Sequence, residues 1–166
     1  MPAFDASVAA LGYRYPVPQL VHRLKFHGDL GVARLLGVVL AERVKSKYGD
    51  DLPDLIVPVP LHARRLARRG FNQSIEIARV VSRELNVPFS TAGASRTKNT
   101  EPQRTLPLAE RRRNVRKGFV AATTRTARSI ALLDDVMTTG ATLDALAGAF
   151  KHLDNPQVHC WVCARA

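Results

Sequence analysis

The segment from Ser129 to Thr142 constrains the fold most, because a buried strand leads through two acids into a helix start. Residues 130–133 are apolar on both faces, as expected of a strand inside a covered parallel sheet. Asp134 and Asp135 follow directly, and adjacent carboxylates are costly inside a core, so we expect them at the strand's exit. Three hydroxyls, a glycine and the free amides of a helix start come next, in Thr138, Thr139, Gly140, Ala141 and Thr142. Such groups bind phosphate.

A capped helix is the simpler alternative, in which one acid and one threonine satisfy local amides. It does not account for two acids and three threonines within nine residues. Because an extended chain rises roughly 3.3 Å per residue, the acids and the turn lie about one sugar apart. We therefore predict that Asp134 and Asp135 accept hydrogen bonds from ribose hydroxyls. The 5-phosphate would bind at the helix start, on a loop of Val136, Met137, Thr138, Thr139, Gly140, Ala141 and Thr142.

The rest of the chain alternates helices and strands, which predicts an α/β fold with a mostly parallel central sheet flanked by helices. Helices are predicted over 17–26, over 30–48 with Asp29 as N-cap and Gly49 as C-terminal stop, over 75–85 and over 141–153. Strands are predicted at 54–57, 87–89, 129–133 and 158–163. We expect residues 1–166 to form a single domain, whose helical part, 1–48, is a candidate flap or hood. Ligands of such sheets bind at the carboxyl ends of the strands.

The chain is strongly basic, with a net charge of +11, which favours anionic partners without choosing among them. Its arginine runs, 64–69 and 111–117, suit phosphate but are also typical of solvated helix faces. No apolar run is long enough to span a membrane and no secretory signal is present, so we expect a cytoplasmic protein. Cys160 and Cys163 lie three apart in a predicted strand, on opposite faces, and are interpreted as buried thiols.

Residues 130–142 resemble the signature of the type I phosphoribosyltransferases. Within that superfamily, residues 57–62, 69–74 and 96–119 resemble the competence protein F family. The resemblance implies binding of 5-phosphoribosyl 1-diphosphate with Mg²⁺, and transfer of the phosphoribosyl group to a nitrogenous base with release of diphosphate. Members of the family often begin with a cysteine-rich zinc ribbon. No cysteine precedes Cys160, so the resemblance implies no metal-binding finger here.

The resemblance also implies roles for two further loops. The loop after the first core strand would hold the diphosphate through Pro58, Val59, Pro60, Leu61 and His62. Because Pro58 and Pro60 lack an N–H, a rigid strand end is an equal alternative. Lys98 and Arg104, in a polar loop, would close over the diphosphate as catalytic groups beside Asp134 and Asp135; an ordinary surface loop is the alternative. Mg²⁺ would be held chiefly through the substrate, with Asp134 and Asp135 as the nearest carboxylates.

A third segment could contact the base or the diphosphate, through Arg68, Arg69, Phe71, Asn72 and Gln73. Helix initiation, with Asn72 as the cap, is the alternative. Three functions stay open: a phosphoribosyltransferase, a non-catalytic nucleotide-binding protein acting in competence, DNA uptake or regulation, and direct binding of single-stranded nucleic acid. The last is weakened by an aromatic content of only 6%. The sequence does not fix the oligomeric state, and a homodimer is compatible with it.

Overall fold

A parallel four-stranded sheet forms the centre of the molecule, in a computed structural model that describes residues 1–97, 118–122, 127–153 and 156–166. Its strands, in spatial order, are β1 (Ala6–Gly12), β6 (Gln157–Arg165), β5 (Ser129–Met137) and β2 (Leu55–Pro58). All three neighbouring pairs are parallel. The predicted α/β class with a parallel sheet is confirmed.

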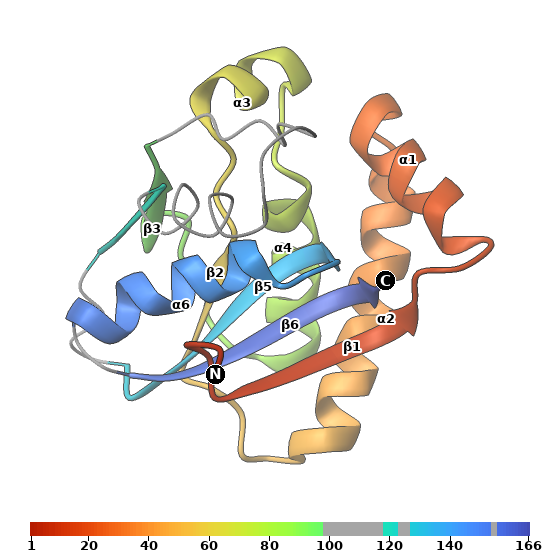
Figure 1. The fold of residues 1–166 in the computed structure, drawn as a ribbon. Helices are drawn as coiled ribbons and strands as arrows, with labels where there is room; N and C mark the ends of the chain where they lie inside the picture. Colours follow the sequence, from red (N-terminus) through yellow and green to blue (C-terminus); the bar gives the residue numbers. More distant parts are fainter. Residues whose placement is uncertain (98–117, 123–126, 154–155) are drawn as a thin grey trace.

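Helices cover both faces of this sheet (Figure 1). On one face lie α1 (Val17–His27), α2 (Leu30–Tyr48) and α4 (Gln73–Leu85), and on the other lies α6 (Ala141–Leu153). The ends of α2 follow the predicted signals: the Asp29 side chain accepts from the Val32 amide, and the Gly49 amide donates to the Lys45 carbonyl. Within the described residues, no helix is long and apolar enough to cross a membrane.

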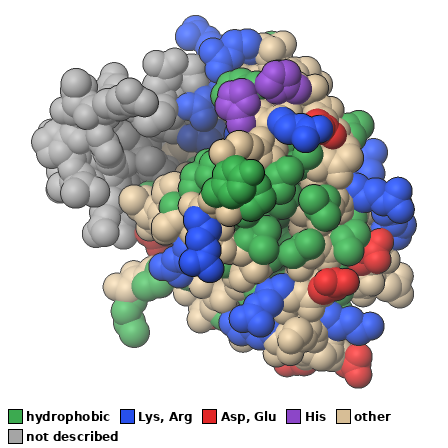
Figure 2. All heavy atoms as spheres, turned by 90° about the vertical axis from the view of Figure 1, so that its right-hand side faces the viewer, with side chains coloured by type: hydrophobic (Ala, Val, Ile, Leu, Met, Phe, Trp, Pro, Cys, Tyr) green, Lys and Arg blue, Asp and Glu red, His purple; other side chains and the backbone are tan. Residues whose placement is uncertain are grey.

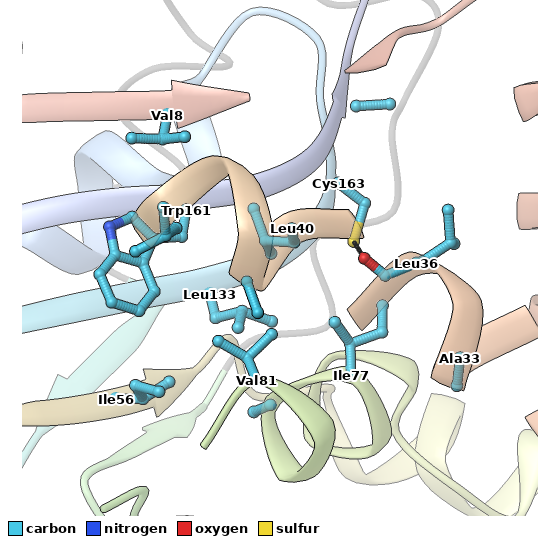
Figure 3. Close-up of a cluster of buried hydrophobic side chains, with 14 of the residues drawn as sticks. Val8, Ala33, Leu36, Leu40, Ile56, Ile77, Val81, Leu133, Trp161 and Cys163 are labelled. Atoms are coloured by element: carbon cyan, nitrogen blue, oxygen red, sulfur yellow. Dashed lines mark hydrogen bonds between the residues drawn. The ribbon is translucent and has the colours of Figure 1, made fainter. Parts of the chain in front are cut away.

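The larger core lies between the sheet and the α2–α4 layer (Figure 3). Trp161 and Cys163 of β6 project into it toward Leu36 and Leu40 of α2. Cys160 belongs instead to the core under α6, so the two cysteines point to opposite faces of β6. Both are fully buried and free, as predicted. Burial raises the pKa of both thiols, which therefore behave as apolar side chains.

The order in which the chain adds strands to the sheet reverses at β2. After β2 it passes through α4 to Phe89, which forms a parallel bridge to Ile56 on the edge of β2 away from β5. It then returns to pair β5 with the opposite edge of β2. Ligands of open parallel sheets bind beside such a switch point, at the carboxyl ends of the strands. The crevice between the ends of β2 and β5 is therefore the expected site.

Several elements differ from the sequence prediction. Residues 1–48 are not only helical, since β1 precedes α1 and pairs with β6. The predicted strand at 87–89 is reduced to the bridge at Phe89. A short helix, α3 (Ala63–Arg69), and an antiparallel pair, β3 (Ala94–Arg96) with β4 (Phe119–Ala121), were not predicted. The sequence pattern of these elements is too weak to predict them, because α3 buries none of its residues and β3 and β4 are each only three residues long.

Candidate functional site

The two acids, Asp134 and Asp135, form a pair that lies within β5. The prediction that the strand ends before them is wrong, because β5 continues to Met137 and Asp134 pairs with Val162 of β6. They nevertheless lie at the carboxyl edge of the sheet on the side of β2, because β2 ends at Pro58, opposite Leu133. Beyond that point one side of β5 faces the crevice. The acid pair is therefore held by strand geometry beside the switch point.

Each acid of the pair has its own partner. The Asp134 Oδ1 accepts from the Ser74 hydroxyl and from the Asp135 amide, both at 2.9 Å. The negative charge on Asp135 is balanced by an ion pair, since Lys25 Nζ lies 2.5 Å from Asp135 Oδ2. This oxygen accepts no well-directed hydrogen bond among the described residues. The Asp135 side chain is only 4% exposed, so this cation, from the end of α1, offsets a charge that burial would otherwise disfavour.

The environment of Asp134 favours its protonated form. Burial, followed by the charge of Asp135, raises the pKa of Asp134 to about 7, although the Ser74 hydroxyl, the Asp135 amide and Lys25 act in the opposite direction. Near neutral pH Asp134 is therefore present in both its protonated and its ionised form. Such a carboxyl beside a crevice can accept a hydrogen bond or a proton from a bound ligand.

The three residues that join β5 to α6, together with the first two residues of α6, are here called the threonine turn (138–142). They form a small pocket with the end of β5. The pocket has a volume of about 40 Å³ and is lined by Asp134 and residues 136–143, which include every residue predicted to bind the 5-phosphate. Thr138 and Thr139 are exposed. Gly140 has a φ of 77°, a left-handed backbone conformation that residues with a side chain rarely adopt. The pocket size, hydroxyls and helix start suit a single oxyanion.

The last residue of β2 and the four residues that follow it are here called the β2 loop (58–62). Its polar groups are mostly engaged in structural contacts. The Val59 amide donates to the Leu133 carbonyl, and the Val59 carbonyl accepts from Asn72 Nδ2. The His62 ring caps α3 by accepting from the Arg64 amide. Since Pro58 and Pro60 lack an N–H, only the amides of Leu61 and His62 have no partner among the described residues. The loop offers fewer donors to an anion than the threonine turn.

The residues predicted to contact a base separate into two groups. Arg68, Arg69 and Phe71 line a pocket of about 540 Å³ together with the end of α1. Asn72 does not; it is buried, and its Oδ1 accepts from the Ser74 amide as the N-cap of α4. Gln73 is also buried and accepts from Arg69. The helix-cap alternative therefore describes Asn72.

Lys98 and Arg104, the predicted loop cations, lie outside the described residues. In the part of the chain that the structure describes, no group of three or more His, Cys, Asp and Glu side chains could hold a metal ion. The acid pair provides few direct ligands, because Lys25 neutralises Asp135 and Asp134 favours a proton. This donor set fits a Mg²⁺ ion that keeps several waters and is bound mainly through a ligand's phosphates.

Two side chains that contact the acid pair, those of Lys25 and Ser74, were not predicted from the sequence. Lys25 is one cation on a short amphipathic helix, and no local signal connects it to residue 135. Ser74 was noted at the start of a helix, but its hydroxyl contact with Asp134 spans 60 residues. Pairing a predicted acid pair with every basic residue near a helix end could have suggested Lys25.

The fold and this site together define an α/β protein whose parallel sheet carries an acid pair and a threonine-rich helix start at its switch point. The chain is 34% identical to competence protein F of Haemophilus influenzae, with 99% of this chain and 75% of that protein aligned. It is 33% identical to the DNA utilization protein YhgH of Escherichia coli K12, over 99% and 74% of the two chains. Competence protein ComFC of Bacillus subtilis is 28% identical over 79% and 52%.

This chain therefore belongs to the competence protein F family. No protein-family model matches it.

Proposed function

We propose that this protein binds 5-phosphoribosyl 1-diphosphate and transfers its phosphoribosyl group to a nitrogenous acceptor. One observation carries the proposal: Asp134 and the threonine turn border one pocket at the switch point of the sheet, and Asp135 is the next residue of β5. Carboxylates suit sugar hydroxyls, and a threonine-rich helix start suits a phosphate. The resemblance of residues 130–142 to the type I phosphoribosyltransferases supports the same ligand.

In the proposed complex the 5-phosphate binds the threonine turn, through the hydroxyls of Thr138 and Thr139 and the amides around Gly140. The 2- and 3-hydroxyls of the ribose donate to Asp134 and Asp135. Both acids are preorganised, Asp134 by the Ser74 hydroxyl and Asp135 by Lys25. This fixed arrangement limits the movement of the sugar, which favours attack at a single carbon.

The proposed reaction exchanges one bond at C1 of the ribose. The C1–O bond to diphosphate breaks and its electron pair leaves on the diphosphate, while the acceptor nitrogen forms a new bond to C1 and loses its proton to water. The transition state resembles an oxocarbenium ion, so Asp134 in its ionised form would stabilise the developing positive charge on the sugar. A bound Mg²⁺ would neutralise the departing diphosphate.

The diphosphate end of the proposed site uses the β2 loop together with Lys98 and Arg104. The amides of Leu61 and His62 are its donors in the β2 loop, since Val59 is engaged with Leu133. Lys98 and Arg104 are proposed to reach the leaving oxygens and to exclude water from the sugar cation. Without that exclusion, water would compete with the acceptor.

The names of the relatives suggest the cellular process. They are called competence proteins and DNA utilization proteins, so we propose a role for this protein in competence or in the use of imported DNA. A second candidate, a non-catalytic protein that binds the same ligand as a signal, is favoured by the protein's narrow set of donors in the β2 loop. Nucleic acid is then a candidate partner, favoured by the net charge of +11.

The test is calorimetry of the full chain with 5-phosphoribosyl 1-diphosphate and Mg²⁺. We expect binding by the native protein and at least a tenfold loss in Asp134→Asn, with Asp50→Asn, an exposed acid after α2, as the matched control. Phosphorus NMR of diphosphate release with a panel of nitrogenous bases then separates a transferase from a binding protein. Absence of binding by the native chain would refute both candidates.

A further inference from the structure

A second pocket, here called the basic pocket, lies beside the acid pair. It is lined by seven residues: Lys25, Phe26, His27, Gly28, Arg68, Arg69 and Phe71. Lys25 connects it to the acid pair, since its ammonium contacts Asp135. Asp134, the other acid, lines the pocket of the threonine turn. The acid pair therefore stands between two pockets, one on each side.

The two pockets differ so much in volume that they suit ligands of different size. The threonine-turn pocket, about 40 Å³, has room for one small anionic group. The basic pocket, about 540 Å³, falls in the range of roughly 300–1,000 Å³ typical of small-molecule sites. If the sugar phosphate occupies the first, the second is the space large enough for the other reactant.

The charge of the basic pocket favours an anion. Among the described residues that line it there is no carboxylate, and they include the cations Lys25, Arg68 and Arg69. Lys25 is neutralised by Asp135, but Arg69 donates only to the neutral Gln73, and Arg68 forms no ion pair within the described residues. The pKa of Arg69 is lowered by burial; Asp135 acts in the opposite direction, while Arg65 and Arg68 add repulsion. A bound anion would relieve that repulsion.

Two phenylalanine rings provide an apolar surface beside these cations. Phe26 is 63% exposed, unusual for so large an apolar side chain, and the Arg69 guanidinium lies 5.7 Å from its ring centroid. Phe71 packs partly against the main core, which fixes its position. Figure 2 shows the neighbouring face, where histidine, Lys and Arg side chains stand together at one end of an apolar area. Flat rings beside guanidinium groups bind planar aromatic anions well.

We propose that the basic pocket binds the acceptor of the phosphoribosyl group, and that this acceptor is a planar aromatic ring carrying a carboxylate. The ring lies against Phe26 and Phe71, and the carboxylate pairs with Arg68 and Arg69. Lys25 marks the boundary with the ribose site, so the ring's reacting edge faces the sugar. The acceptor role rests on the proposed function, whereas the ligand class rests on the lining residues alone.

The ligand class is tested with matched probes that differ only in charge. Nicotinate and nicotinamide, and 1-naphthoate and 1-naphthamide, are titrated into the full chain and followed by protein-observed NMR. We expect at least one carboxylate to bind about tenfold more tightly than its amide. Equal affinity within each pair, or no binding of any probe, overturns the proposal.

Variants of exposed residues locate the binding. Arg68→Gln should reduce the preference for the carboxylate at least fivefold, and Phe26→Leu should weaken both members of a pair. Arg23→Gln, an arginine of α1 that pairs with Asp29 outside the pocket, should change neither. Unaltered binding in both pocket variants overturns the assignment.

Affinity for 5-phosphoribosyl 1-diphosphate, measured in the same variants, separates this inference from the proposed function. We expect Arg68→Gln and Phe26→Leu to bind it within twofold of the native chain. A loss above fivefold in Arg68→Gln would place the diphosphate in the basic pocket and overturn an acceptor there. Aromatic binding without any binding of the diphosphate would refute the proposed function and the acceptor role, and leave the ligand class supported.

Discussion

The threonine turn and the β2 loop leave the same edge of the sheet, yet their polar groups are used very differently. In the threonine turn, Thr138 and Thr139 are exposed and Gly140 allows a tight approach to the start of α6. In the β2 loop, Val59 is bonded on both its amide and its carbonyl, and His62 caps α3. One strand end therefore leaves polar groups exposed, whereas the other uses them in structural contacts, and the number of unpaired donors among the described residues distinguishes the two.

Removing the hydroxyls of the threonine turn should have the largest effect. In Thr138→Val/Thr139→Val two hydrogen bonds to a charged phosphate are lost, each contributing about 1.5–3 kcal/mol. We expect affinity for 5-phosphoribosyl 1-diphosphate to fall more than about 100-fold in calorimetry. Thr138→Ser/Thr139→Ser, which keeps both hydroxyls, should retain most of it. Comparable losses in the two variants would contradict an anion-binding role of these hydroxyls.

Breaking the junction at the β2 loop should instead reduce stability. Asn72→Ala removes the N-cap of α4 and leaves the buried Val59 carbonyl without its donor. We expect the free energy of unfolding to fall by about 2–3 kcal/mol in urea titrations. Asn72→Ser keeps a capping oxygen and should lose less. A change below about 0.5 kcal/mol in Asn72→Ala would show that these contacts do not hold the loop.

Asp134, which stands between the two segments, should produce a pH dependence of stability. Its pKa is about 7 in the folded protein against an ordinary value of 3.8, so between these values the folded state keeps a proton that the unfolded chain has lost. The free energy of unfolding should therefore decrease as the pH rises from about 4 to about 7, by at most about 1.4 kcal/mol per unit. Asp134→Asn should flatten the profile measured by urea unfolding at several pH values; an unchanged slope would assign it to other groups.

The smallest effect is expected for the free donors of the β2 loop. Leu61→Pro removes one unpaired amide, which should weaken binding of 5-phosphoribosyl 1-diphosphate by about 1 kcal/mol, or roughly fivefold. Leu61→Ala keeps the amide and serves as the control in the same calorimetry. A loss as large as that of the threonine-turn variant would mean that the two segments contribute equally, and the comparison would fail.

Periodicity and local motifs predicted much of this fold. The helices α1, α2, α4 and α6 and the strands β2, β5 and β6 lie where apolar spacing and capping residues placed them. The strand β1 was missed because its sequence, ASVAALG, consists mostly of small residues and has only Val8 buried, so no alternation of apolar and polar residues is visible. What makes it a strand is its pairing with β6, which no local pattern encodes.

The candidate site was predictable to the same extent. The threonine turn and the acid pair are contiguous in sequence, and residues 134 and 136–142 do line one pocket. Lys25 and Ser74 could not be found this way, because their partners lie 110 and 60 residues away in the sequence. The extension of β5 through the acids also depends on β6. Composition predicts that the strand ends at Leu133, but pairing with β6 continues to Met137.

The parallel pairing of β1 with β6 has a consequence for synthesis. Ala6 pairs with His159, so about 150 residues separate the partners along the chain. At roughly 5–20 residues per second, a ribosome needs on the order of ten to thirty seconds to make that interval. During this interval β6 has not yet been made, so β1 lacks the strand it pairs with and its backbone donors face water or a chaperone. Closure of the sheet is thus among the last folding events, and it completes the support beneath β5 and its acids.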